Sequence, residues 1–227
     1  MKLVTTGDLE IGQAPQERLA AALELAFGSL PEAERRGMAD LALSKAGQPG
    51  VAAFEARRDG RLIGALYCEV QLGGSAGLWP PQTVAGASAA EEGLVERCSQ
   101  LLLESAAAWL RPQRIKVVQS LLAADSGRDA DRLRAAGFTH SADLLYLVSL
   151  ASSFPSAPIE TKLSFEPVSS RSDEELARLL EATYEQTLDC PALNGVQDCR
   201  DVLAGYRATG SFDPSRWFFV RREGRDI

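Results

Sequence analysis

The sequence predicts an α/β fold, in which a mixed, largely antiparallel sheet is flanked by helices and followed by part of a second copy. Three observations carry this prediction. Apolar segments alternate between strand-like and helix-like spacing, Asp59-Gly60 joins two apolar runs as a hairpin, and a short stretch near the start recurs near the end.

The predicted element order over the first 150 residues is β-α-α-β-β-β-α-β-α-β. After a strand in the opening residues, the elements are helices 15–27 and 30–45, the hairpin strands of 51–72, strand 76–79, a helix from the Gly/Ala/Ser stretch 85–90 to about residue 110, strand 114–122, a short helix ending at 136, and strand 144–148.

The end of the last helix has a specific local signal. Gly137 can adopt the left-handed conformation that closes a helix, and Phe138 can pack back on its last turn. The run 144–148 (LLYLV) that follows is as apolar as a buried strand, so we expect it to close the sheet.

Composition excludes several classes of protein. The chain has 45% hydrophobic and 24% charged residues and a net charge of −7, which is typical of a globular protein and unfavourable for a broad nucleic-acid-binding face. No apolar run approaches a membrane span, and the first residues do not resemble a secretory signal. Four scattered cysteines favour a reduced, cytoplasmic protein.

A metal site is not predicted. Cys190, Cys199 and His140 lack the spacing of zinc ligands, and His140 is expected at the surface.

The chain contains an internal repeat. Residues 54–63 (FEARRDGRLI) and 218–227 (FFVRREGRDI) are identical at six of ten positions and share an acidic-Gly turn. Before the second stretch come a linker-like segment, 151–158, then strand 163–168, helix 172–187, helix 198–207 and strand 217–222. We therefore expect a first domain at 1–155 and, at 156–227, the incomplete front part of a second domain, the sequence being a piece of a longer tandem protein.

Two local motifs carry a resemblance to a known family. Leu78-Trp79-Pro80 ends a strand with an apolar-x-Pro pattern, Thr83 to Ser88 then leads into a helix, and Ala-Gly-Phe ends the helix at 136–138. With the element order, these motifs resemble the GNAT superfamily of acyl-CoA-dependent N-acyltransferases, of the tandem-domain type. The resemblance implies acetyl-CoA as acyl donor, an amine of a small molecule or peptide as acceptor, and direct attack of the amine on the thioester.

The resemblance places the cofactor at the strand end and the loop. A helix N-terminus offers unpaired N–H groups to a pyrophosphate, small residues allow close approach, and a splayed strand end offers backbone groups to pantetheine and the thioester carbonyl. The implied cofactor-binding residues are Leu78, Pro80, Thr83, Gly86, Ala87, Ser88 and Ala89. A plain helix start capped by Ser88 is the alternative interpretation of the loop.

The sequence departs from the family pattern at three positions. Thr83 replaces an Arg or Gln, Ser88 replaces a Gly or Ala, and Leu133 stands where the family often places an acid-supplying Tyr. We therefore leave the catalytic residues unassigned, and our hypothesis is that this half binds acyl-CoA weakly or not at all. Tyr146 is a conceivable acid, although an aromatic residue in an apolar strand is more often part of the core. The alternative function is a non-catalytic module that binds a ligand or a partner.

Two further groups of residues are candidates for contacts with a substrate or with solvent. Asp189, Cys190 and Asn194 could contact an acceptor, but the surrounding Pro191 and Gly195 also predict a simple turn. The helix residues Glu91, Glu92 and Glu96 are expected at the solvated surface. The oligomeric state is left open.

Overall fold

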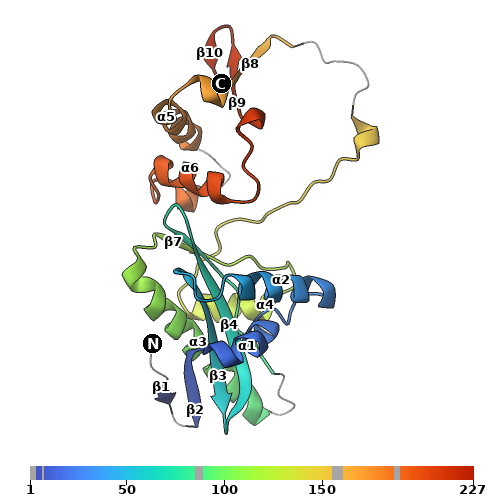
Figure 1. Ribbon diagram of the computed structural model, residues 1–227, viewed down its shortest axis with the longest axis vertical. Coiled ribbons are helices and arrows are strands. Elements are labelled where there is room, and N and C mark those ends of the chain that lie inside the picture. Colours follow the sequence, from blue (N-terminus) through green and yellow to red (C-terminus); the bar gives the residue numbers. More distant parts are fainter. Residues whose placement is uncertain (1–3, 7, 85–88, 155–160, 187–189) are drawn as a thin grey trace. The chain divides into compact units, whose positions relative to one another are not determined.

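The computed structural model describes residues 4–6, 8–84, 89–154, 161–186 and 190–227 (Figure 1). The chain divides into two compact units, Met1–Thr139 (unit 1) and His140–Ile227 (unit 2). No helix in the described ranges is both long enough and apolar enough to span a membrane.

Unit 1 contains most of the secondary structure. Its strands and α-helices are β1 (Val4–Thr6), β2 (Leu9–Gln13), α1 (Leu19–Ala26), α2 (Glu32–Ser44), β3 (Val51–Arg58), β4 (Arg61–Gln71), β5 (Ser75–Leu78), β6 (Gln82–Thr83), α3 (Ala89–Leu110), β7 (Val117–Gln119) and α4 (Gly127–Ala135).

The unit 1 sheet is mixed and mostly antiparallel, as the sequence predicts. Its strand order is β1-β2-β3-β4-β5-β7, and β6 pairs separately with β4. Every pair is antiparallel except β5 with β7. The central β3–β4 hairpin turns at Asp59 and Gly60, whose φ angles of 48° and 73° are the positive values such a turn needs.

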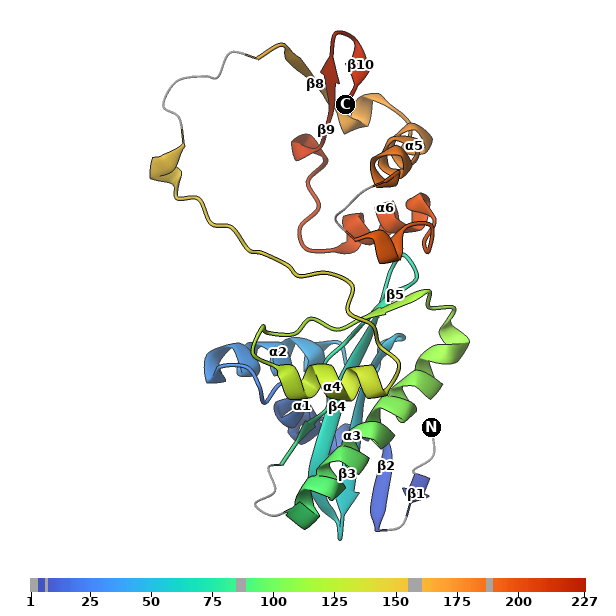
Figure 2. The same ribbon diagram turned by 180° about the vertical axis from the view of Figure 1, so that it is seen from behind.

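Helices cover both faces of this sheet (Figures 1 and 2). On one face, α1 and α2 pack with Phe27 and Tyr67 in an apolar cluster. On the other, α3 and α4 pack over Phe54 and Leu66, with Leu102 of α3 fully buried. Alternate residues of the central strands β3 and β4 enter opposite clusters, which is the pattern expected of a sheet between two helical layers.

The end of α4 has the predicted geometry. Gly137 has a φ of 91°, the Phe138 N–H donates to the Leu133 carbonyl over 3.0 Å, and Phe138 packs against the α3-side cluster. These are the hydrogen bond and the apolar contact of a glycine-closed helix.

The predictions for the two strands on either side of α4 need correction. The strand predicted at 114–122 is present only as β7, because its parallel partner β5 pairs with it over three positions. The strand predicted at 144–148 is wrong. These residues have no assigned strand, are drawn as an extended trace without an arrow in Figure 1, and are 61–92% exposed. An apolar run is not enough to make a strand, because a strand also needs the backbone of a neighbour to pair with.

Unit 2 is smaller. Its strands and α-helices are β8 (Leu163–Pro167), α5 (Asp173–Tyr184), α6 (Cys199–Ala208), β9 (Phe218–Arg222) and β10 (Arg225–Asp226). The strands form an antiparallel sheet in the order β10-β9-β8. Helix α5 begins at a capping box in which the Ser172 hydroxyl accepts from the Glu175 N–H and the Glu175 carboxylate accepts from the Ser172 N–H.

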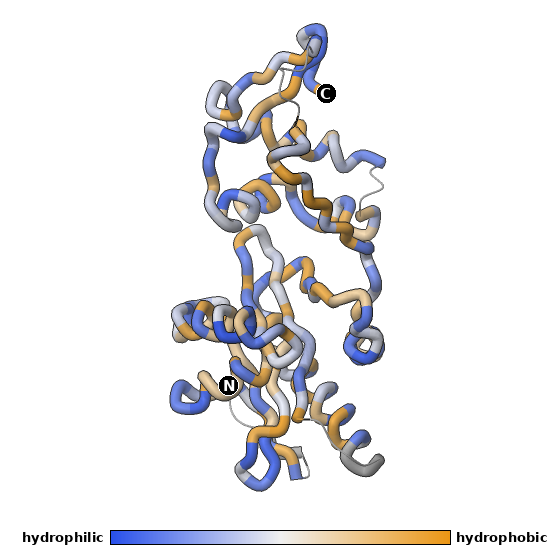
Figure 3. Tube along the Cα trace, turned by 90° about the vertical axis from the view of Figure 1, so that its right-hand side faces the viewer, coloured by the Kyte–Doolittle hydropathy of each residue, from blue (hydrophilic) through white to orange (hydrophobic). Residues whose placement is uncertain are grey.

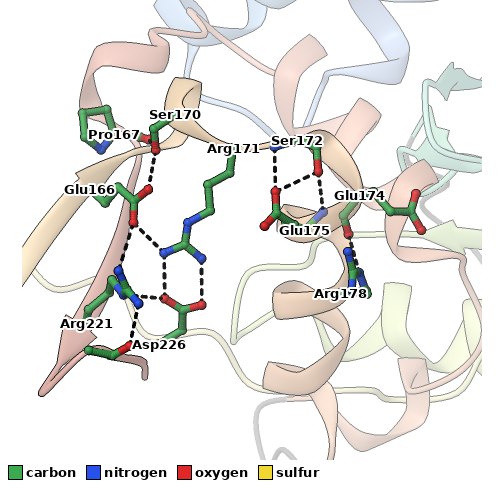
Figure 4. A network of polar contacts seen from close by, with 11 residues as sticks. Glu166, Pro167, Ser170, Arg171, Ser172, Glu174, Glu175, Arg178, Arg221 and Asp226 are labelled. Atoms are coloured by element: carbon green, nitrogen blue, oxygen red, sulfur yellow. Dashed lines mark hydrogen bonds and ion pairs between the residues drawn. The ribbon is translucent and has the colours of Figure 1, made fainter.

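An arginine links the three strands of unit 2 (Figure 4). Arg171 donates to Glu166 at 2.6 Å and to Asp226 at 2.8 and 2.9 Å, and its guanidinium lies 4.1 Å from the ring centroid of Phe219. Arg171 lowers the pKa of the Glu166 carboxyl to about 2 and also lowers the pKa of Asp226. The network joins β8 to β10 through a side chain that is itself 14% exposed.

The two units share one arrangement of strands. Leu9 of β2 pairs with Arg58 of β3, and Leu163 of β8 pairs with Arg222 of β9, so the aligned repeats occupy the same register. The second hairpin turns with positive φ at Glu223 and Gly224, as the first does at Asp59 and Gly60. In both turns an arginine side chain donates to the glycine carbonyl, Arg57 to Gly60 and Arg221 to Gly224.

Candidate functional site

The candidate site lies where two parallel strands separate. The β5–β7 ladder runs from Ser75 and Val117 to Gly77 and Gln119, and Leu78 continues β5 beyond its last recorded β7 partner. On its other edge Leu78 still pairs with Cys68 of β4. A parallel pair that opens at the carboxyl ends of its strands leaves backbone groups available to a ligand, which is where open α/β sheets usually bind one.

Ser120 lies at this opening. It follows Gln119 directly, and within the described residues its hydroxyl is buried without a hydrogen-bond partner. An unpaired buried hydroxyl costs about 1–3 kcal/mol, so a polar group of a bound molecule would find a partner there.

Helix α3 is held close to the sheet beside the site. A Cβ atom on Gly64 of β4 would lie 2.5 Å from the Cys98 sulfur and 3.4 Å from a methyl carbon of Thr83, so only glycine fits. Burial raises the pKa of Cys98 to about 12 and that of Cys68 to about 12. Both thiols are therefore protonated at neutral pH and are poor nucleophiles.

The structure brings together part of the predicted cofactor set. Leu78 and Pro80 are buried at the strand end, Thr83 pairs with Gly64 through β6, and Ala89 is the first residue of α3. Gly86, Ala87 and Ser88 lie outside the described residues. The predicted pyrophosphate loop is thus bounded on both sides, by Thr83 and by the start of α3, and its cofactor role stays a prediction.

On the opposite face of the sheet, near the end of β5, a hydrogen-bonded group of polar side chains lies beside a cavity. Trp79 stacks edge-on against Tyr67, with ring centroids 5.2 Å apart. The Tyr67 hydroxyl donates to Glu69 over 2.9 Å, and Lys45 donates to the same carboxylate over 2.6 Å. Burial and Glu69 raise the pKa of Tyr67, so its hydroxyl stays protonated. A cavity of about 160 Å³ adjoins Tyr67, lined also by Gln13, Gln16, Leu19 and Val51 among others.

The other candidate residues lie away from this opening or remain buried. Leu133, where the resemblance would place an acid, is buried in the α3-side core. Tyr146 is 80% exposed, so its expected place in the core is wrong. His140 is at the surface, where it contacts Asp143 at 3.0 Å.

The structure describes part of the unit 2 loop and of the α3 glutamates. Pro191–Leu193 forms a short 3-10 turn followed by exposed Asn194, which agrees with the turn interpretation; Asp189 lies outside the described residues. Glu92 is exposed. Glu96 is half exposed and accepts hydrogen bonds from Arg132 of α4, which lowers the pKa of Glu96. Among the described residues no group of three His, Cys, Asp or Glu side chains is suited to hold a metal ion.

Sequence reasoning missed three features of the site. Gly64 in the run LIGAL carried the usual signal of close backbone approach within a strand. Ser120 was the single hydroxyl in the apolar stretch VVQSLL. The contact of Lys45 with Glu69 joins residues 24 positions apart, and local spacing contains no signal for it.

Comparisons with known proteins find similar solved structures at low sequence identity. No protein-family model matches the sequence, and no curated protein matches it. Similar solved structures include the aminoglycoside antibiotic 6'-N-acetyltransferase AAC(6')-IG from Acinetobacter haemolyticus, at 18% identity and a TM-score of 0.47, covering 62% of this chain and 97% of that one.

Two more such structures have similar values. Aminoglycoside N-acetyltransferase AAC(6')-Iy, solved with CoA, is 16% identical with a TM-score of 0.47, covering 65% of this chain and 99% of that one. An aminoglycoside acetyltransferase from an uncultured soil metagenomic sample, solved with trehalose, is 12% identical with a TM-score of 0.46, covering 63% and 96%. Beside its mixed sheet, the chain has a small three-stranded antiparallel sheet.

Proposed function

We propose that residues 1–155 form an N-acyltransferase-type domain that takes acetyl-CoA at the opening between β5 and β7 and an amine as acceptor. The observation that supports this most is the end of the parallel ladder at Gly77 and Gln119, directly beside the unpaired Ser120 hydroxyl. Bound there, the thioester would be exposed to direct attack by the amine nitrogen; the C–N bond forms, the C–S bond breaks, and the thiolate leaves with a proton. The residues of this chain contribute positioning and backbone polarisation of the carbonyl.

The second part of the proposal concerns residues 156–227. They form the front part of a second domain of the same kind, because β8, α5, α6, β9 and β10 repeat β2, α1, α2, β3 and β4 in order and in strand pairing. The shared register and the shared arginine-to-glycine hydrogen bond in the turn support a duplication rather than a chance likeness.

Calorimetric titration of the full chain with acetyl-CoA tests the cofactor site. We expect binding at micromolar or weaker affinity. Ser120→Ala should weaken it about fivefold through the loss of one hydrogen bond, and Ser120→Phe should abolish it by filling the opening. Ser164→Ala, an exposed serine of β8, is the matched control and should have no effect. If Ser120→Phe binds acetyl-CoA as tightly as the unchanged chain does, the opening between β5 and β7 is not the cofactor site. Sub-micromolar affinity of the unchanged chain would refute the view that this half is degenerate.

A non-catalytic module is the second candidate, and the burial of Leu133 at the position of the family's acid favours it. The two functions differ in turnover. Release of free thiol from acetyl-CoA, in the presence of a mixture of small and peptide amines, should exceed the amine-free background for an enzyme. A chain that binds acetyl-CoA yet releases thiol only at background is a binding module.

A further inference from the structure

One face of the unit 2 sheet carries apolar residues that remain about half exposed in the part of the chain that the structure describes. Strand alternation places Phe165, Phe218 and Val220 on this outer face and Glu166 and Phe219 on the other. Phe165 is 55% exposed and Phe218 47% exposed, and their rings pack edge to face with centroids 6.3 Å apart. Phe219, on the inner face, is 1% exposed. Two adjacent half-exposed phenylalanines are a typical start of a protein-binding patch.

The equivalent face of unit 1 is fully covered. The shared register makes Ile11 the counterpart of Phe165, Phe54 the counterpart of Phe218, and Ala56 the counterpart of Val220. All three unit 1 residues are at most 2% exposed. The cover is α3, which places Trp109 edge-on against Phe54 with ring centroids 6.2 Å apart.

The side of α3 that covers the unit 1 sheet is an apolar stripe along the helix. Its buried residues Cys98, Leu102, Ala106 and Leu110 recur every fourth position and form one apolar face of the helix. The exposed remainder of α3 includes Glu92, Glu96 and Glu104. A helix of this kind fits a flat apolar sheet face with polar residues outward.

We infer that the outer face of unit 2 is the binding surface for an amphipathic helix of the α3 type, with an apolar stripe toward the sheet and acidic residues outward. The inference rests on the duplication proposed above and is independent of acyl-CoA binding. Hydropathy along the trace (Figure 3) shows apolar segments in both units, but only four apolar residues of unit 2, Val168, Ala177, Leu203 and Phe219, are buried in the described structure. A covering helix would bury Phe165 and Phe218, as α3 buries Ile11 and Phe54 in unit 1.

A peptide with the sequence of residues 89–113 is the probe, because its helix is known to fit the matching face. Fluorescence anisotropy of the labelled peptide should show saturable binding to the full chain. Phe165→Ser with Phe218→Ser should weaken binding at least tenfold, while Phe165→Leu with Phe218→Leu should retain it. Leu72→Ser, which removes a leucine that is 68% exposed in unit 1, is the matched control. A peptide with Leu102 and Ala106 changed to serine should not bind.

Three results would overturn the inference: no binding of the peptide, equal binding by all chain variants, or a dimer in analytical ultracentrifugation that the double serine variant abolishes. The last would mean that a second copy covers this face. Hydrogen exchange of β8 and β9 in the double serine variant shows whether unit 2 stays folded. Acetyl-CoA affinity, which depends on unit 1, should be the same in all these variants, so failure here is distinguishable from failure of the acyl-CoA site.

Discussion

Units 1 and 2 build the same five opening elements on different cores. In unit 1, the side chain of Glu55 in β3 lies on the sheet face opposite to α3 and is 2% exposed. Its carboxylate accepts a hydrogen bond from Arg18 over 2.6 Å. In unit 2 the equivalent position of β9 is Phe219, with Arg171 stacked over its ring. An arginine thus contacts this position in both units. Arg18 donates to the Glu55 carboxylate itself, whereas Arg171 lies over the Phe219 ring and donates to Glu166 and Asp226.

The comparison shows that strand pairing is enough to form the shared three-stranded arrangement. Burial of the two sheet faces depends on the helices and strands that follow it in the chain. Unit 1 continues into β5, α3, β7 and α4 and covers both faces of its sheet. In unit 2, Phe165 and Phe218 on the outer face of the sheet are 55% and 47% exposed. The outer face therefore contributes little to stability in unit 2 and much in unit 1.

The largest expected effect tests this contrast directly. Phe54→Ala should destabilise unit 1 by about 3–5 kcal/mol, because it opens a cavity under α3. The equivalent Phe218→Ala should cost under about 1 kcal/mol, since that ring is already half in water. Hydrogen exchange followed by mass spectrometry in urea reads each unit separately. Equal losses at the two positions would contradict the contrast.

The next effect concerns the equivalent inner positions. Glu55→Gln should destabilise unit 1 by roughly 2 kcal/mol, because it leaves Arg18 and Arg57 without their buried anion; Arg18 is 35% exposed, which limits the loss. Phe219→Leu should cost about 1 kcal/mol, as a near-conservative change in a small core. Urea unfolding of each variant measures the loss of unfolding free energy. A smaller loss for Glu55→Gln than for Phe219→Leu would contradict the expected order.

Helix starts give a smaller effect. Ser172→Ala should cost unit 2 about 1 kcal/mol, because it removes the capping box of α5. Its counterpart α1 follows a 3-10 turn and Arg18, with no side-chain cap. Arg18→Ala should therefore change stability through Glu55 and not through the helix start. Amide exchange in the first turn of α5 should rise in Ser172→Ala and stay constant in the control Ser164→Ala.

The smallest effect is a pH dependence of the Glu166–Arg171 pair in unit 2. Because Arg171 depresses the folded-state pKa of Glu166 to about 2, this carboxylate stabilises the fold above its unfolded pKa of about 4.3. That stabilisation is lost as the pH falls from about 4.5 toward 2. Amide exchange of β8 and β10 should speed up over this range at low salt. In Glu166→Gln the change should shrink, while Asp226 and the other carboxyls of unit 2 with lowered pKa still contribute.

Local chemistry was sufficient to predict much of both units. The Asp59-Gly60 and Glu223-Gly224 turns, the glycine-closed end of α4 and the amphipathic helices all follow from backbone conformation and side-chain spacing within a few residues. The repeat of residues 54–63 and 218–227 was visible in the sequence, and its shared strand register follows the alignment of identical residues.

Only the tertiary structure decided where strands find partners and where they do not. The run 144–148 is more apolar than β3, yet it is exposed. Strand β7 pairs over three positions, and the Ser120 hydroxyl that follows has no partner among the described residues. Likewise, Phe54 and Phe218 are equivalent in sequence and differ in exposure. The physical reason is that pairing and burial are contacts between distant segments, so the residues at one position do not specify them.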